Sequence, residues 1–91
     1  MKVHQTSDGK LVAACDEDVL GKEFTEGEKQ LIVAESFYKG EKVDLLAVLD
    51  ELEGAHTTNF VGNELNDELV DSEIVQPDEV DHIDGMAHSQ L

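Results

Sequence analysis

Apolar and polar positions alternate differently in the two halves of the chain. Short alternating or continuous apolar segments fill residues 1–40 and predict β-strands, whereas a helical spacing of apolar residues dominates residues 43–75. A further apolar segment, residues 79–83, predicts a final strand, and the polar residues 85–91 are expected to form a loose tail. A length of 91 residues suits one domain, so we expect residues 1–91 to fold as a single α+β unit.

The first two predicted strands form a hairpin. Residues 2–6 and 11–16 flank an Asp-Gly pair, and this dipeptide between alternating segments is a strong hairpin signal. If that pair forms a two-residue turn, Val3 lies opposite Ala14, and both side chains share one face with Val12. The second strand is apolar on both faces, so we expect it in the interior of a sheet.

A helical turn and two more strands are expected before residue 40. Asp16 can cap the free amides of one helical turn, which Gly21 can close. Residues 22–24 and 30–35 are predicted strands, joined by a turn that contains Gly27. Together with the hairpin they indicate a meander or a small barrel-like sheet.

Two helices are predicted in the second half of the chain. Leucine and valine residues recur at i, i+3, i+4 and i+7 within residues 43–53, the pattern of a helix with one buried face, and Gly54 is its expected end. Residues 55–59 are expected to be a linker, and residues 63–72 form the second helix. The predicted fold is therefore a small, mostly antiparallel sheet of four to five short strands with two helices packed on it.

The charge of the chain is strongly negative and uneven. The sequence contains 22 acidic residues, six lysines and no arginine, and its formal net charge is −16. Residues 1–42 hold a balance of −3 and residues 43–91 a balance of −13. Two explanations are open: a surface adapted to a salty cytoplasm, which we favour, and an acidic half that docks on a basic partner.

The sequence indicates a cytoplasmic protein. No apolar run approaches the length of a membrane span, and the first five residues are not followed by the apolar segment of a signal peptide. The single cysteine cannot form an internal disulfide, which is typical of a reducing compartment. We therefore expect a cytoplasmic location and no membrane partner.

Candidate catalytic and metal-binding residues are few. Cys15 ends a predicted strand and shares a face with His4 across the hairpin, so these two residues are the best candidates for an enzyme site. Three acids directly follow Cys15 and oppose a thiolate, which favours a small core residue instead. The histidines and the cysteine lack zinc-ligand spacing, and the acids after Cys15 do not complete a calcium loop. We expect no dedicated metal site and no cofactor.

Four short segments match the pattern of a known family. They are residues 14–24 (ACDEDVLGKEF), 36–41 (SFYKGE), 59–64 (NFVGNE) and 87–90 (AHSQ). In this order and spacing the chain resembles a family of small archaeal proteins catalogued as a domain of unknown function (four-two-four). The resemblance implies a cytoplasmic archaeal α+β protein with an RNA-binding or translation-associated role, and it carries over no catalytic residues.

The segments marked by this resemblance supply the candidate binding residues. They lie at the ends of predicted elements, where loops present groups to partners, and their glycines permit a close backbone approach. An aromatic residue beside lysines also suits the bases and phosphates of a nucleic acid. We expect residues 36–41, 59–62 and 88–90 to converge on one face; the alternative is that Phe37 and Phe60 are core residues and the glycines serve turns. The candidate residues are Phe37, Tyr38, Lys39, Gly40, Asn59, Gly62, His88 and Gln90.

The sequence favours a non-enzymatic binding module that acts on RNA or on a translation-associated protein. One alternative is an acidic protein-interaction module that docks on a basic protein through residues 43–91. A less favoured alternative is a small enzyme with a site near His4 and Cys15.

The first testable prediction concerns the acidity. If it is an adaptation to salt, the melting temperature should rise steeply from low to molar KCl, because counter-ions screen the repulsion between carboxylates. Thermal unfolding at neutral pH measures this response, and the same series close to the isoelectric point is the control. A flat response at neutral pH would remove the explanation and favour a specific cationic partner.

Overall fold

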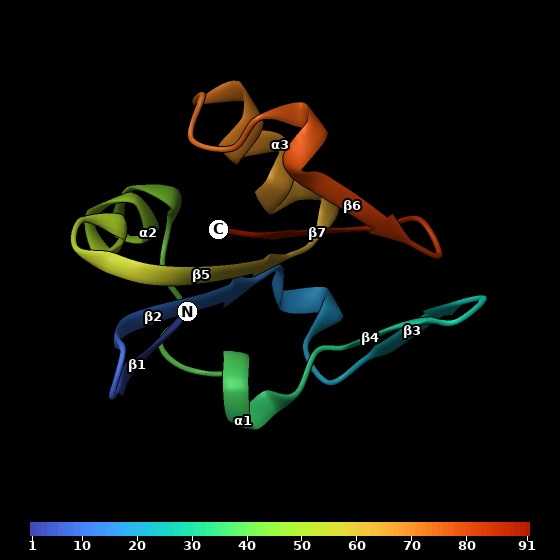
Figure 1. Cartoon of the computed structure of the whole chain (residues 1–91), viewed down its shortest axis with the longest axis horizontal. Coiled ribbons are helices and arrows are strands. Elements are labelled where there is room, and N and C mark those ends of the chain that lie inside the picture. The colour runs from blue at the N-terminus through green and yellow to red at the C-terminus, as the bar shows by residue number, and fades with distance from the viewer.

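A five-stranded sheet forms the centre of the molecule. The computed structural model describes all 91 residues (Figure 1). The strands of this sheet lie in the order β1-β2-β5-β7-β6, and only the β2–β5 pair is parallel. The predicted α+β fold with a mostly antiparallel sheet is confirmed at this level, and the parallel pair was not predicted. The strands are β1 (Lys2–Thr6), β2 (Gly9–Cys15), β5 (Ala55–Val61), β6 (Val80–Ile83) and β7 (Met86–Gln90).

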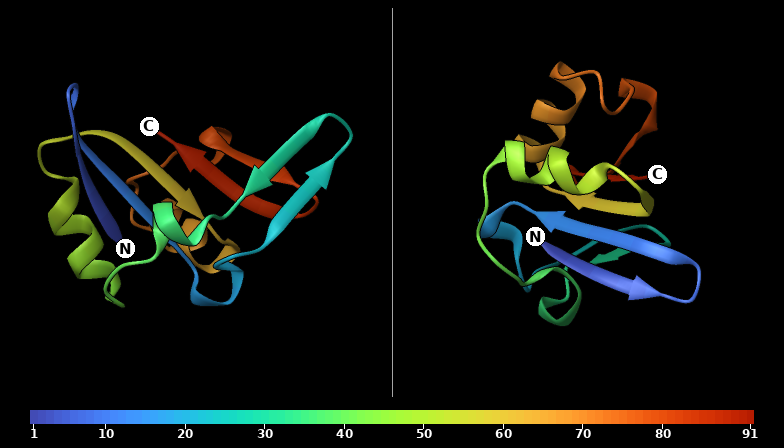
Figure 2. Two further views of the ribbon diagram at one scale, coloured as in Figure 1. Left: turned by 90° about the horizontal axis from the view of Figure 1, so that it is seen from below. Right: turned by 90° about the vertical axis from the view of Figure 1, so that its left-hand side faces the viewer.

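Three α-helices and a second, two-stranded sheet cover the two faces of the main sheet (Figure 2). Helices α2 (Leu45–Leu52) and α3 (Asn63–Asp71) lie on one face, over a core that includes Val12 and Phe60. The short helix α1 (Glu35–Tyr38) and the second sheet lie on the other face. That sheet is a hairpin of β3 (Glu23–Glu26) and β4 (Lys29–Ile32), and the core beneath it includes Ala13 and Val61.

The β1–β2 hairpin has a register that differs from the predicted one. Val3 pairs with Val12 instead of Ala14, and Thr6 pairs with Gly9, so the turn residues are Ser7 and Asp8. The Thr6 side chain closes this turn, because its hydroxyl donates to the Gly9 carbonyl at 2.9 Å and accepts from the Asp8 amide at 3.2 Å. The register is displaced by two residues, which leaves the predicted faces intact. β2 lies between β1 and β5, as its apolar pattern predicted.

The expected four-stranded meander is wrong. β3 and β4 pair only with each other, and the predicted strand at residues 30–35 ends at Ile32. Two backbone hydrogen bonds, from Gly21 to the Val33 carbonyl at 2.8 Å and from Val33 to the Lys22 carbonyl at 2.9 Å, close the base of this hairpin. Its apolar residues Leu31 and Val33 are buried against the main sheet, so the hairpin packs across a face instead of extending an edge.

The two predicted helices are confirmed, with ends that lie slightly inside the predicted ranges. α2 begins after Asp44, whose carboxylate accepts from the Ala47 amide at 3.1 Å. The predicted apolar stripe of α2 faces the sheet, and Val48 at its centre is buried. α3 follows Gly62 directly, and its apolar residues Leu65 and Leu69 join the same core.

Two of the five central strands were not predicted. Residues 55–59, expected to be a linker, belong to β5, and the expected loose tail forms β7 between β5 and β6. The backbone of Thr58 exchanges hydrogen bonds with Leu91 at 2.9 and 3.2 Å, so the pairing continues to the end of the chain. Ser89 of β7 donates to the buried side chain of Asn66 at 2.6 Å and thereby ties the strand to α3. None of the helices is long and apolar enough to cross a membrane.

Candidate binding cleft

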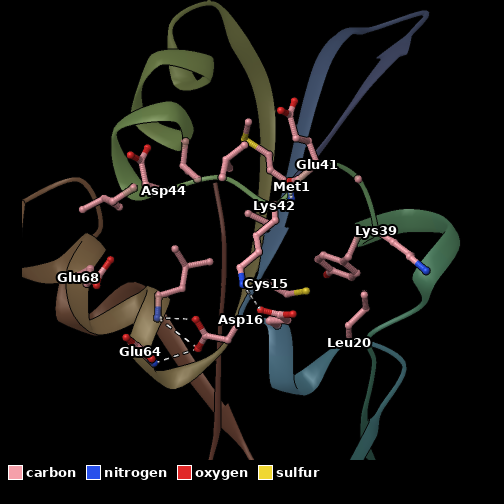
Figure 3. A pocket seen from close by; sticks show the side chains of 18 residues that line it. Met1, Cys15, Asp16, Leu20, Lys39, Glu41, Lys42, Asp44, Glu64 and Glu68 are labelled. Carbon is pink, nitrogen blue, oxygen red and sulfur yellow. Dashed lines mark hydrogen bonds and ion pairs between the residues drawn. The ribbon is translucent and has the colours of Figure 1, made fainter.

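A cleft of about 730 Å³ opens beside the end of β2 (Figure 3). Its walls are the 3₁₀ turn Glu17–Val19, the segment that joins α1 to α2, and the first turns of α2 and α3. The floor is apolar, and the side chains that form most of it are Ala14, Leu20, Val43, Leu45, Val48 and Leu65.

Carboxylates surround the apolar floor and differ in how they are engaged. Asp16 and Asp44 accept hydrogen bonds at the starts of α3 and α2, and Glu17 pairs with Lys42 at 2.9 Å. The remaining carboxylates of the cleft make no hydrogen bond or ion pair within the protein; they belong to Glu41, Glu64 and Glu68. Against these six acids the cleft contains two lysines, so its electrostatic potential is negative.

Asp16 positions the wall that α3 provides. Its carboxylate accepts from the amides of Glu64 and Leu65, each at 3.1 Å, and makes no capping bond to its own 3₁₀ turn. The expectation that Asp16 caps the turn that follows it is therefore wrong, because the free amides of α3 lie within its reach. Gly62 lies against this carboxylate at φ +130°, and a Cβ atom there would overlap Asp16. Burial raises the pKa of Asp16, although the two amides act in the opposite direction.

Cys15 lines the cleft. Burial raises the pKa of Cys15; the positive N-terminus opposes this change, and Asp16 and Asp18 add to it. His4 lies elsewhere: its Nε2 atom is 2.8 Å from the Phe37 carbonyl, and its ring stacks on Phe37 with centroids 4.9 Å apart.

The structure does not bring the proposed enzyme pair together. His4 pairs with Leu11, which lies four residues before Cys15 on β2, or about 13 Å at the rise of a strand. The His4 ring contacts the Phe37 carbonyl through its Nε2 atom, and no side chain orients the ring towards a thiol. No group of three or more His, Cys, Asp or Glu side chains has a metal-binding arrangement. His4 and Cys15 are therefore not arranged as a base and nucleophile pair.

The candidate residues from the sequence fall into two groups. Tyr38, Lys39 and Gly40 line the cleft, and Phe37 stacks on His4 outside it. Gly40 allows the cleft wall to pass close to the start of the chain, because a Cβ atom there would overlap the backbone of Met1.

The other candidate residues lie on β5 and β7 or at the start of α3. Asn59 pairs with Gln90 in the ladder, and the His88 Nε2 atom lies 3.3 Å from the Asn59 Oδ1 atom. Burial lowers the pKa of His88, and Asp81 acts in the opposite direction. Gly62 is buried beside Asp16 and serves the α3 cap. The structure thus brings the segments around Asn59 and His88 side by side, while residues 38–40 contribute to the cleft.

Several cleft residues were missed because their roles depend on packing. Leu45 and Val48 were predicted as one helix stripe, but the sequence does not indicate that part of the stripe lines a cleft. Glu64 and Glu68 lie one turn apart on α3, and this i, i+4 spacing was the available signal that both carboxylates share one side of the helix.

The fold and the cleft define a small α+β protein with an apolar, acid-rimmed cleft. The chain belongs to the family described as "Protein of unknown function (DUF424)", whose model matches residues 4–91. The crystal structure of an uncharacterized conserved protein from Methanopyrus kandleri is similar, with a TM-score of 0.74 and 28% sequence identity over 99% of this chain and 86% of that chain. No curated protein matches the chain. The family resemblance is confirmed, and neither description states a function or supports the RNA-binding role.

The Asp16 cap predicts a large effect of a single substitution on stability. Asp16→Ala removes the acceptor for two amides of α3, and loss of a helix cap costs about 0.5–2 kcal/mol. Asp16→Asn retains one acceptor oxygen and should cost less. Urea unfolding measures both, with Asp18→Ala as the matched control because its exposed carboxylate makes no hydrogen bond. Equal losses in Asp16→Ala and Asp18→Ala would contradict the capping role.

Tyr38 predicts a loss of stability in alkaline solution. Burial raises the pKa of Tyr38 to about 12, from a usual value of 10.0. The folded protein therefore keeps the phenol protonated where the unfolded chain ionises it. The contribution of Tyr38 to the free energy of unfolding is therefore intact below pH 10 and is lost as the pH rises towards 12.

Urea unfolding on both sides of pH 10 tests this dependence. The Tyr38 hydroxyl makes no hydrogen bond within the protein, so Tyr38→Phe should fold and should lose less stability across the same interval. The same pH dependence in both proteins would assign the alkaline loss to other groups.

Proposed function

We propose that this protein is a non-enzymatic binding module whose cleft takes a basic, partly apolar segment of a partner protein. The observation that carries the proposal is the apolar floor enclosed by carboxylates, three of which have no partner within the chain. A lysine or arginine side chain satisfies such carboxylates, and neighbouring apolar side chains of the same segment cover the floor.

The floor and the rim have different roles in this proposal. Full burial of one leucine side chain is worth about 1.5–3 kcal/mol, whereas an exposed ion pair contributes about 0–1 kcal/mol. The floor therefore supplies most of the affinity. The carboxylates select a cationic segment over an anionic one and, with the net charge of −16, accelerate its approach at low salt.

The charge distribution favours a protein partner over RNA. Affinity for a nucleic acid comes mainly from cations on phosphates, and three of the six lysines are engaged with Glu51, Asp81 and Glu17. The RNA role implied by the family resemblance stays a prediction. A basic translation-associated protein in the cytoplasm, where a single thiol stays reduced, satisfies the translation-associated role that the resemblance implies as well as this proposal.

A peptide-binding experiment tests the proposal. The probe is a fluorescein-labelled amphipathic peptide of leucine and lysine, with a leucine–glutamate peptide of the same pattern and a single-stranded RNA as comparisons. Fluorescence anisotropy should detect binding of the lysine peptide alone, and the affinity should fall with increasing salt. Cys15 provides a local readout, because an occupied cleft should slow its reaction with a thiol reagent.

Two matched variants separate the cleft from the general charge. Replacing Glu41, Glu64 and Glu68 by Gln removes the three free carboxylates of the cleft and should weaken binding several-fold. The control variant replaces three exposed acids on the hairpins, and these are Asp8, Glu23 and Glu28. Equal weakening in both variants, unprotected Cys15, or preferential binding of the RNA would overturn the proposal.

A further inference from the structure

The ion pair between Lys42 and Glu17 crosses the cleft. Lys42 lies in the irregular segment between α1 and α2, and its Nζ atom reaches the Glu17 carboxylate on the opposite 3₁₀ turn at 2.9 Å (Figure 3). Both side chains are largely exposed, at 83% and 75%, so the pair buries almost no surface. An ion pair of this kind contributes little to the stability of the fold.

The two ends of this pair are held in place independently of it. The Glu17 turn follows Asp16, whose carboxylate is bound to α3, and the turn buries Val19 in the core. On the other side, Gly40 lies against the backbone of Met1, and the Met1 amino group donates to the Glu41 carbonyl at 3.0 Å. The Lys42 ammonium is therefore not needed to join the two walls.

We infer that Glu17 is the carboxylate that anchors the cation of the partner segment, and that Lys42 is a built-in competitor that occupies this anchor in the free protein. The inference rests on the proposed function of the cleft. Glu17 is the cleft carboxylate that already pairs with a lysine ammonium. A lysine of the partner segment would bind Glu17 in the same way, in place of Lys42. Asp16 and Asp18, its neighbours in the chain, add to the negative potential at this point.

Competition by Lys42 has a limited and measurable cost. An incoming cation must displace Lys42 from a single exposed ion pair. Lys42 therefore lowers the affinity of a cationic segment by about 1.4- to 5-fold. Anionic segments gain nothing from Glu17, so the competition does not affect them.

The experiment compares Lys42→Gln with Lys22→Gln by anisotropy with the labelled leucine–lysine peptide. Both substitutions remove one positive charge, but the exposed Lys22 lies outside the cleft and makes no ion pair. We expect Lys42→Gln to bind the peptide about 1.4- to 5-fold more tightly than Lys22→Gln does. Adding Glu17→Gln to Lys42→Gln should remove that gain, and urea unfolding should show unchanged stability for Lys42→Gln.

The outcomes separate this inference from the proposed function. If the unmodified protein binds the peptide with protection of Cys15, but Lys42→Gln and Lys22→Gln bind it equally, the cleft function stands and the competitor role is wrong. A weaker affinity of Lys42→Gln, or a gain that persists after Glu17→Gln, also overturns the inference. If neither the unmodified protein nor Lys42→Gln binds the peptide, the proposed function and the inference fail together.

Discussion

The carboxylate of Asp16 at the start of α3 is the interaction on which the rest of the site depends. It joins the end of a central strand to a helix that lies almost fifty residues further along the chain, through hydrogen bonds to two backbone amides. The junction leaves no space for a side chain at residue 62, and the φ of +130° there favours glycine. Because α3 begins at this junction, Asp16 also determines where one wall of the cleft stands.

The same junction explains why the surroundings of Cys15 do not favour thiol chemistry. Burial raises the pKa of the Cys15 thiol, and the capping carboxylate of Asp16 adds to this effect, against the opposing positive charge of the N-terminus. A reactive cysteine needs the opposite surroundings, with positive charge or a free helix N-terminus nearby. The N-terminus of α3 lies close by, but Asp16 has already satisfied its amides.

The sequence predicted the parts of the fold that local patterns determine. Helices α2 and α3 and the two faces of the first hairpin follow from apolar periodicity, because the predicted apolar positions are the buried ones; the short helix α1 was not predicted. β5 and β7 were missed because both carry polar residues along most of their length and form only through pairing between distant segments. The candidate site was predicted in part: residues 38–40 line the cleft, but no local signal could assign Asp16 to a helix so far along the chain.

The acidic residues fall into two sets: those spread over the exposed surface and those that surround the cleft. The two sets differ in what lies beside them. An acidic surface that only binds water and counter-ions needs no apolar area, and charged groups spread over exposed helix faces serve that purpose. In the cleft, the carboxylates instead surround Leu20, Val43 and Leu45, whose side chains remain partly exposed. Exposed apolar area adds nothing to hydration, so salt adaptation does not account for it. The combination of an apolar floor with unpaired carboxylates is therefore the feature that supports the proposed cationic, apolar partner, whatever the remaining acids do for the molecule in salt.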